Sequence, residues 1–193
     1  MAKLVVIVGA VTKPGRLNKA MTRMCEMARE LEAGLETDLI NLADCKIAFA
    51  DGRAPEEYGD DTAAVVARVR AADTVVIATP VYRATFTGAL KNLLDQLPIE
   101  TLMGKPCGIV AMGATTHHYL GADWHLRDVL TWFGALTAPA SVYLASADFA
   151  EGEPTESARR DLRALAAAVL KLRALSSDAA NYLGPIPLAA RKS

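Results

Sequence analysis

Three short apolar runs constrain the fold of this 193-residue chain more than any other feature. They cover residues 4–8, 74–78 and 108–112, and none of them alternates apolar with polar residues. Alternation is typical of a sheet with one face in solvent, whereas a continuous apolar run is typical of a strand buried on both faces. The three runs therefore predict the central strands of a parallel sheet that lies between two layers of helices.

The segments between these runs have a helical spacing of apolar residues. In the first of them, Met21, Met24, Cys25 and Ala28 recur at i, i+3, i+4 and i+7. Apolar residues on one side of each segment predict further helices over residues 62–70, 86–97, 126–133 and 162–169. Strand and helix therefore alternate along the chain, which is the pattern of a doubly wound α/β fold with right-handed crossovers.

Two weaker strand segments set the predicted strand order. Residues 36–42 and 136–144 contain polar residues, and the second includes Pro139, which removes a ladder donor and is tolerated mainly at a sheet edge. These segments are expected to be the outer strands. The sequence thus predicts an α/β, three-layer, doubly wound sandwich with a five-stranded parallel sheet of order 2-1-3-4-5. One domain is expected, because 52% hydrophobic residues can bury a sizeable core at this length.

Charge and cysteine content argue against several classes of partner. A formal net charge of -1 gives no electrostatic reason to expect nucleic acid or an anionic membrane as a partner. Cys25, Cys45 and Cys107 are far apart and form no CxxC pair, which is typical of reduced thiols. The first apolar run is too short for an export signal. We therefore expect a cytoplasmic protein.

A sheet of this order binds ligands where the strand order reverses, between the first and third strands. Three loops should meet there, at residues 9–18, 79–87 and 113–118. The first precedes a predicted helix, whose N-terminal amides can hold an anion, and Thr12, Lys13, Arg16 and Asn18 add donors. This loop matches neither GxGxxG nor GxxxxGK[ST]. We interpret it as a phosphate cradle, with an ordinary solvated turn as the alternative.

The second loop suits a planar ligand. Pro80 restricts the backbone, Tyr82 brings a flat ring, and Gly88 permits close backbone approach. Residues 78–95, ATPVYRATFTGALKNLLD, closely resemble the flavin-contacting segment of the NADPH-dependent FMN reductases, particularly those that supply reduced flavin to sulfonate monooxygenases. The resemblance implies that the flavin ring edge is lined by Thr79, Pro80, Val81 and Tyr82. The alternative is that Tyr82 only caps the core.

The third loop resembles the small-residue turn with which the family approaches the pyrimidine end of the flavin. The resemblance places Gly113, Ala114 and Thr115 there, where main-chain donors would stabilise the anionic reduced flavin. In the helix that follows, Trp124 matches an aromatic residue that sulfonate-linked members carry in a π-helical bulge at the subunit interface. A large residue in the core or facing a dimer partner is the alternative for Trp124.

The first loop fits the family only in part. Gly9 and Arg16 match the family pattern, but Ala10 and Thr12 stand where Ser and Arg are usual. Binding of the flavin phosphate is therefore expected to depend on backbone amides together with Thr12, Arg16 and Asn18.

The resemblance implies a flavodoxin-like NAD(P)H-dependent FMN reductase domain over residues 1–175, with FMN and either NADPH or NADH as cofactors. Hydride transfer needs stacking geometry more than an acid or base, so no catalytic side chain is predicted. Reduced flavin would pass to a partner monooxygenase, and the family implies a homodimer or homotetramer. Two alternatives stay open, an FMN-retaining quinone or azo reductase and a flavodoxin-like electron carrier. The net charge of -1 disfavours the carrier, because such carriers are usually strongly acidic.

The remaining polar motifs and the tail carry less information. His117, His118 and His125 lack an HExxH spacing, so hydrogen bonding or interface packing is favoured and no metal site is predicted. There is no Ser-His-Asp order or nucleophile elbow to indicate a hydrolase. Residues 176–193 are expected to form a C-terminal surface arm that is either frayed or packed on a second subunit.

Overall fold

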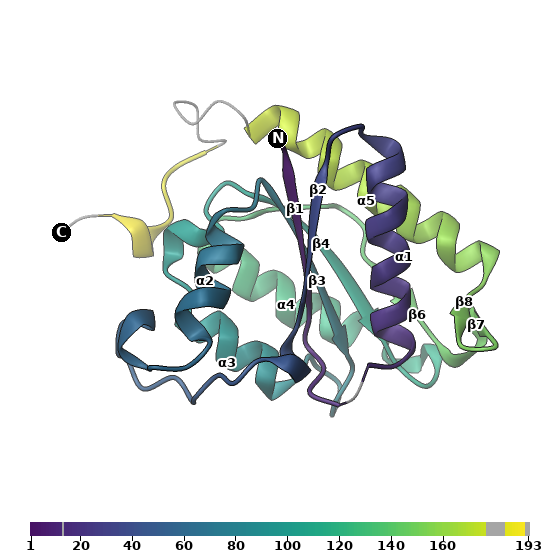
Figure 1. Cartoon of the computed structure of the whole chain (residues 1–193), viewed down its shortest axis with the longest axis horizontal. Helices are drawn as coiled ribbons and strands as arrows, with labels where there is room; N and C mark the ends of the chain where they lie inside the picture. Colours follow the sequence, from purple (N-terminus) through teal and green to yellow (C-terminus); the bar gives the residue numbers. More distant parts are fainter. Residues whose placement is uncertain (13, 177–183, 192–193) are drawn as a thin grey trace.

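The computed structural model describes residues 1–12, 14–176 and 184–191. Its parallel sheet has the order β2-β1-β3-β4-β5, which confirms the predicted 2-1-3-4-5 topology (Figure 1). The three apolar runs form the central strands β1 (Lys3–Val8), β3 (Thr74–Pro80) and β4 (Pro106–Met112), and β2 (Glu36–Asn41) is an outer strand. The predicted central and outer positions are therefore correct.

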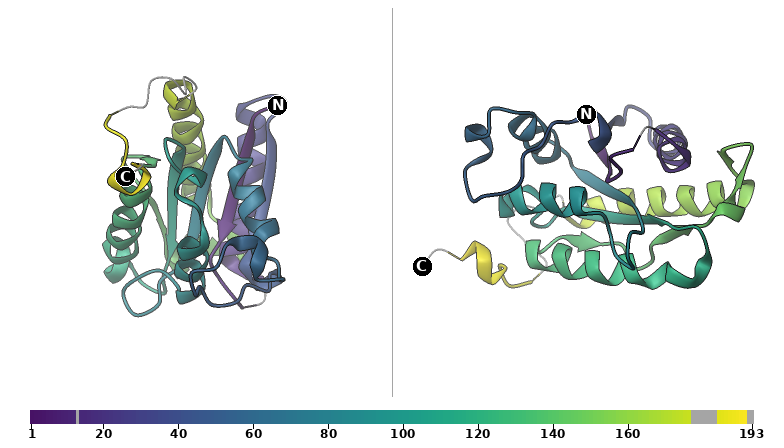
Figure 2. Two further views of the ribbon diagram at one scale, coloured as in Figure 1. Left: turned by 90° about the vertical axis from the view of Figure 1, so that its left-hand side faces the viewer. Right: turned by 90° about the horizontal axis from the view of Figure 1, so that it is seen from below.

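Helices cover both faces of the sheet (Figure 2). On one face α1 (Arg16–Leu31) and α5 (Glu156–Ser176) pack against Val6 and Val8 of β1. On the other face, α2 (Thr62–Arg70), α3 (Gly88–Gln96) and α4 (Tyr119–Phe133) pack against Val5 and Ile7. Successive side chains of β1 thus enter two different halves of the core, which is the reason that its sequence is continuously apolar.

The fifth position of the sheet is divided between two short strands. β5 (Leu136–Thr137) and β6 (Val142–Leu144) both pair in parallel with β4, and Pro139 lies in the segment between them. The predicted single strand over 136–144 is therefore interrupted, because the missing N–H of proline removes a ladder donor. A small antiparallel hairpin of β7 (Phe149–Ala150) and β8 (Glu153–Pro154), which the sequence did not predict, follows.

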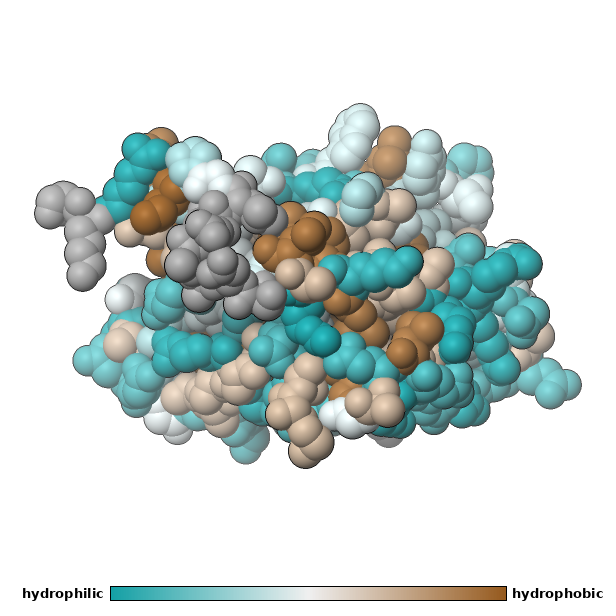
Figure 3. Space-filling view, turned by 90° about the horizontal axis from the view of Figure 1, so that it is seen from above, coloured by the Kyte–Doolittle hydropathy of each residue, from teal (hydrophilic) through white to brown (hydrophobic). Residues whose placement is uncertain are grey.

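Short 3₁₀ helices occupy several of the connections. They are η1 (Leu42–Asp44), η2 (Pro55–Glu57), η3 (Ile99–Thr101), η4 (Thr116–His118), η5 (Ser146–Asp148) and η6 (Leu188–Ala190). Half of the predicted C-terminal arm, residues 177–183 and 192–193, lies outside the described residues, and η6 is the helix in its described part. No helix among the described residues is long and apolar enough to cross a membrane. At the amino-end edge of the sheet, apolar and polar residues are intermixed on the surface (Figure 3).

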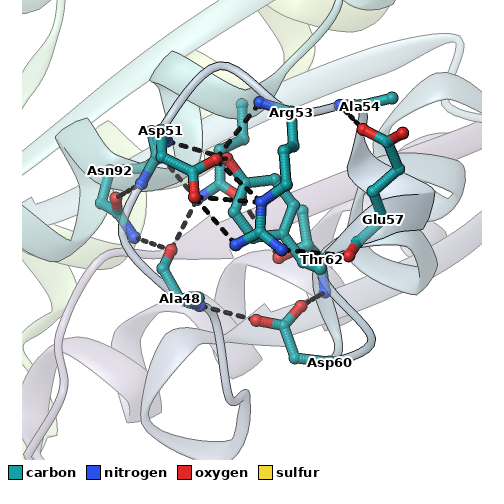
Figure 4. Close-up of polar contacts among 11 residues, drawn as sticks. Ala48, Asp51, Arg53, Ala54, Glu57, Asp60, Thr62 and Asn92 are labelled. Carbon is teal, nitrogen blue, oxygen red and sulfur yellow. Dashed lines mark hydrogen bonds and ion pairs between the residues drawn. The ribbon is translucent and has the colours of Figure 1, made fainter.

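The connection from β2 to α2, residues 45–61, is ordered by polar contacts with α3 (Figure 4). Asn92 donates to the carbonyl of Ala48 at 2.9 Å and accepts from the amide of Ala50 at 2.9 Å. Within the connection, Asp51 accepts from Arg53 and from the Tyr58 hydroxyl, and these contacts lower the pKa of its carboxyl group. This segment therefore forms a compact loop beside α3, although its sequence contains no strand or helix pattern.

Candidate functional site

The loops after β1, β3 and β4 enclose one crevice at the carboxyl ends of these strands. Its volume is about 310 Å³, which is within the range of small-molecule sites. Its lining residues are Val8, Ala10, Thr12, Pro14, Gly15, Arg16, Leu17, Asn18, Asn41, Pro80, Val81, Tyr82, Met112, Gly113 and Ala114. The three loops that the sequence predicted to meet at the switch point do so.

Eight of the ten residues predicted to bind the cofactor line this crevice. They are Thr12, Arg16, Asn18, Pro80, Val81, Tyr82, Gly113 and Ala114. Thr79 and Thr115 do not line it. Thr79 is fully buried, and its hydroxyl accepts from the amide of Thr87 at 3.2 Å. Thr115 is exposed, and its hydroxyl lies 3.2 Å from Nδ1 of His117.

The first loop leads into the N-terminus of α1, which no side chain caps. Gly15 is the N-cap residue and cannot supply a capping oxygen, and no acidic residue occupies the first turn. The first N–H groups of a helix have no partner inside the helix, so an anion at this end would accept their hydrogen bonds. Because Gly15, Arg16, Leu17 and Asn18 all line the crevice, this end of it favours an anionic group. Lys13, which the sequence also suggested as a donor, lies outside the described residues.

Arg16 brings the positive charge of the crevice. Among the described lining residues it is the only one whose side chain carries a charge at neutral pH. Its Nη2 donates to the Ser146 hydroxyl at 3.4 Å, and its guanidinium carbon lies 5.3 Å from the centre of the Phe149 ring. Ser146 and Phe149 were not predicted from the sequence, since they are 130 or more residues further along the chain and belong to no recognisable motif.

Tyr82 stands at the base of a tight hairpin after β3. Tyr82 and Thr85 exchange two backbone hydrogen bonds, of 2.8 and 3.2 Å, so that Arg83 and Ala84 form its two-residue turn. The Tyr82 side chain is 47% exposed and lines the crevice. It therefore forms part of the wall of the crevice and does not cap the core, and its contact with a flavin ring stays a prediction.

The second and third loops are joined directly. The amide of Val81 donates to the carbonyl of Met112 at 2.8 Å, which continues the pairing of β3 with β4 beyond the ends of the strands. The second and third loops are thereby held next to each other, with Pro80 and Gly113 both in the wall of the crevice. One further lining residue, Asn41 at the end of β2, had no signal in the sequence.

The described residues that line the crevice include no carboxylate, imidazole, thiol or amine side chain, since none of them is Asp, Glu, His, Cys or Lys. In the described part of the chain, no cluster of three or more His, Cys, Asp or Glu side chains is placed to hold a metal ion. The arrangement can bind and orient a ligand that carries its own reactive group, with an anion at the α1 end.

Trp124 lies on the solvent side of α4. All residues of Tyr119–Phe133 are α-helical, so the π-helical bulge implied by the resemblance is not found in this helix. Trp124 is 62% exposed, which excludes the core alternative for this residue.

Comparisons with known proteins agree on one family. The model of the NADPH-dependent FMN reductase family matches residues 2–150. An NAD(P)H-dependent FAD/FMN reductase of Geobacillus thermodenitrificans is 38% identical over 124 residues, 64% of this chain and 67% of the relative. The NADH-dependent FMN reductase SfnF of Pseudomonas fluorescens is 30% identical over 154 residues, 79% of this chain and 81% of the relative.

Solved structures agree on the fold. The apo form of the NADH:FMN oxidoreductase EmoB has a TM-score of 0.77 at 23% identity, covering 99% of this chain and 100% of that chain. An archaeal flavodoxin has a TM-score of 0.63 at 9% identity, covering 89% and 99% respectively. The fold is therefore flavodoxin-like, and on the match over residues 2–150 this chain belongs to the NADPH-dependent FMN reductase family.

Proposed function

We propose that this protein is an NAD(P)H-dependent FMN reductase that binds FMN in the crevice described above. The observation that carries the proposal is that one crevice is lined both by an uncapped helix N-terminus with Arg16 and by Tyr82 with small residues. A flavin mononucleotide has the matching parts, a phosphate and a flat ring. Family membership supports the same activity.

The residues of the crevice fit FMN in their chemistry. Thr12, Arg16 and Asn18 would hold the phosphate together with the first amides of α1. Pro80, Val81 and Tyr82 would orient the ring, and the lack of side-chain bulk at Gly113 and Ala114 would let main-chain groups approach it. When bound, FMN supplies the acceptor for hydride from NADPH or NADH. The protein's own task would then be to bind and orient the flavin and the nicotinamide.

A retained flavin is the second candidate function. It is favoured by the quinone reductase of Escherichia coli, which is 29% identical over 138 residues, 69% of this chain and 72% of the relative. The two functions differ in whether FMN leaves after reduction. In the first case reduced flavin passes to a partner such as a monooxygenase. In the second, it reduces a quinone while bound.

Steady-state oxidation of NADPH and NADH, with and without free FMN, distinguishes the two. We expect the rate to rise with micromolar FMN and the purified protein to lose flavin on desalting. A rate that does not change with added FMN but rises with a quinone would establish the retained-flavin function. A protein that oxidises neither nucleotide under either condition would contradict the proposal and leave the electron-carrier alternative.

Substitutions of Tyr82 and Arg16 test the position of the site. Tyr82→Ala removes a stacking surface and should raise the Kd for FMN by about tenfold. Arg16→Ala removes a charged donor to the phosphate and should raise it by about 10- to 100-fold. Tyr58→Ala and Arg160→Ala remove residues of the same types outside the crevice and should leave the Kd unchanged. Fluorescence titration measures all four, and unchanged values for both crevice variants would refute the site.

Assembly and compartment are part of the same proposal. Tyr119, Trp124 and Trp132 of α4 are 54%, 62% and 56% exposed, and such aromatic residues favour a subunit interface in a homodimer or homotetramer. All three cysteines are unpaired, which fits a reducing compartment such as the cytoplasm. Sedimentation velocity of the purified protein checks the oligomeric state.

A further inference from the structure

Two consecutive residues of β6 hold both ends of the turn at 113–115, which forms one wall of the crevice. The carbonyl of Leu144 accepts from the amide of Gly113 at 3.0 Å. The hydroxyl of Tyr143 donates to the carbonyl of Thr115 at 2.6 Å. The turn lies between these two bonds, and its Gly113 and Ala114 line the crevice. Its shape therefore depends on a strand that has no residue in the crevice wall.

The geometry of β6 explains why Tyr143 reaches this turn. Val142 and Leu144 point into the half of the core that contains α1 and α5. Since side chains alternate along a strand, Tyr143 points to the opposite face of the sheet. There the hydroxyl end of its ring lies against Gly113. A Cβ on Gly113 would clash with the Tyr143 hydroxyl and lie 3.1 Å from Cζ of the ring.

Glycine at 113 is therefore required for space. Gly113 is not among the residues with positive φ, so the conformation of its backbone would accept other residues. The absence of a side chain is what lets the Tyr143 hydroxyl reach the Thr115 carbonyl. Burial also raises the pKa of the Tyr143 hydroxyl, so the group is a protonated donor throughout the neutral pH range.

We propose that Tyr143 is a positioning residue for the flavin site, which fixes the turn at 113–115 so that its main-chain groups favour the reduced form of FMN. The inference rests on the proposed function. Negative charge builds up on the flavin ring when it is reduced, and main-chain N–H groups held in place stabilise such charge without having to reorganise. A turn that can move would lose part of this preference.

The substitution Tyr143→Phe tests the proposal, because it keeps the ring and removes only the hydroxyl. We expect the Kd for reduced FMN, measured anaerobically, to rise by about fivefold, and the Kd for oxidised FMN to rise by less than about twofold. The apparent reduction potential of bound FMN should fall correspondingly. Tyr58→Phe removes a tyrosine hydroxyl that donates to Asp51 outside the crevice and should change neither constant.

A second pair of variants tests the packing of Tyr143 on Gly113. Gly113→Ala places a methyl group against the Tyr143 hydroxyl and should displace the ring, weakening the binding of both forms of FMN. In the double variant Gly113→Ala/Tyr143→Phe the hydroxyl is gone, and the nearest ring atom, at 3.1 Å, needs to move by only a few tenths of an ångström. We expect the double variant to bind FMN more tightly than Gly113→Ala alone. Weaker or equal binding would overturn this packing.

The failure of this inference can be told from failure of the proposed function. If the unmodified protein binds no FMN, the proposed function fails. If it binds FMN and Tyr143→Phe leaves both constants unchanged, Tyr143 has no positioning role. Equal weakening of both redox forms together with a lower Tm would show a merely structural role and would also overturn the inference. Selective loss of affinity for reduced FMN at an unchanged Tm would support it.

Discussion

Arg83 and Ala84 both have left-handed backbone angles at the tip of the hairpin that carries Tyr82, with φ of 51° and 66°. Such angles cost a residue with a side chain about 1–2 kcal/mol, and a two-residue turn of this kind usually contains Asn or Gly. The strain persists because the surroundings hold the turn, and it is found beside the crevice. The backbone of Arg83 and Ala84 therefore follows the shape of the site and not the turn preference of these two residue types.

Replacing Ala84 by glycine should relieve part of this strain. We expect Ala84→Gly to stabilise the fold by roughly 0.5–1 kcal/mol, since the gain at the left-handed position exceeds the extra entropy of the unfolded chain. This corresponds to a Tm increase of about 1–4 °C in thermal unfolding. The same change at Ala67, in the interior of α2, should instead destabilise by about 1 kcal/mol. A Tm decrease for Ala84→Gly would show that the turn is not strained.

At the scale of elements, one close approach joins α4 to the hairpin. A Cβ on Gly121 would clash with the Ala84 carbonyl oxygen and lie 3.2 Å from its carbon. On the other side of the hairpin, Thr87 caps α3 by accepting from the amide of Leu90 at 3.1 Å and also donates to the carbonyl of Gly9. The wall that contains Tyr82 is thus held between α4 and the first loop. The position of Tyr82 therefore depends on contacts of its hairpin with α4, α3 and the first loop.

An ion pair between Asp38 and Arg68 links the outer strand β2 to α2. Asp38 accepts from Nε of Arg68 at 3.1 Å, and Lys3 of β1 lies 3.6 Å from the same carboxylate oxygen, Oδ2. Arg68, followed by Lys3, lowers the pKa of the Asp38 carboxyl group below its ordinary value. Because folding favours the ionised form, this group stabilises the protein above about pH 4. The contribution is lost as the pH falls through the lowered pKa.

Asp38→Asn should remove this dependence on pH. At pH 7 we expect the free energy of unfolding to fall by about 1 kcal/mol, because the pair is partly exposed to solvent. The difference from the unmodified protein should become smaller as the pH falls through the lowered pKa of Asp38. Urea unfolding between pH 2 and 7 measures it, with the exposed Asp128→Asn as the control. A difference that stays constant over this range would contradict the assigned role.

At the scale of the whole molecule, each half of the core contains one buried cysteine. Cys25 of α1 packs into the half of the core between α1, α5 and the sheet, and Cys107 of β4 packs into the half on the opposite face of the sheet. Burial raises the pKa of the Cys25 thiol to about 11 and that of Cys107 to about 12. Thiols in such surroundings are unreactive until the chain around them opens.

Thiol labelling should therefore follow global unfolding. We expect Cys25 and Cys107 to resist a thiol reagent in buffer and to become labelled at the same urea concentration, because a single domain unfolds cooperatively. Mass spectrometry after labelling resolves the two sites. Cys45, which is only half-buried, should react first. Different urea midpoints for Cys25 and Cys107 would show that the two helix layers unfold separately.

The sequence by itself determined the strand order, the two helix layers and the meeting of three loops. These features follow from short-range periodicity: continuous apolar runs place strands in the centre, and a parallel order brings their carboxyl ends to one edge. Eight residues predicted from these loops and from the resemblance to FMN reductases line the crevice. The sequence also indicated where the outer strand would be weak, because Pro139 has no backbone N–H to donate to the sheet.

Only the tertiary structure decided which side chains complete the site. Tyr143, Ser146 and Phe149 come from segments that follow the third loop, and their place depends on the register of β6 against β4. The sequence also did not reveal that Thr79 is buried in the core, although Pro80 and Val81, which follow it, line the crevice. A local pattern sets the state of the backbone, but contacts between residues 28 to 130 positions apart depend on the packing of the whole molecule.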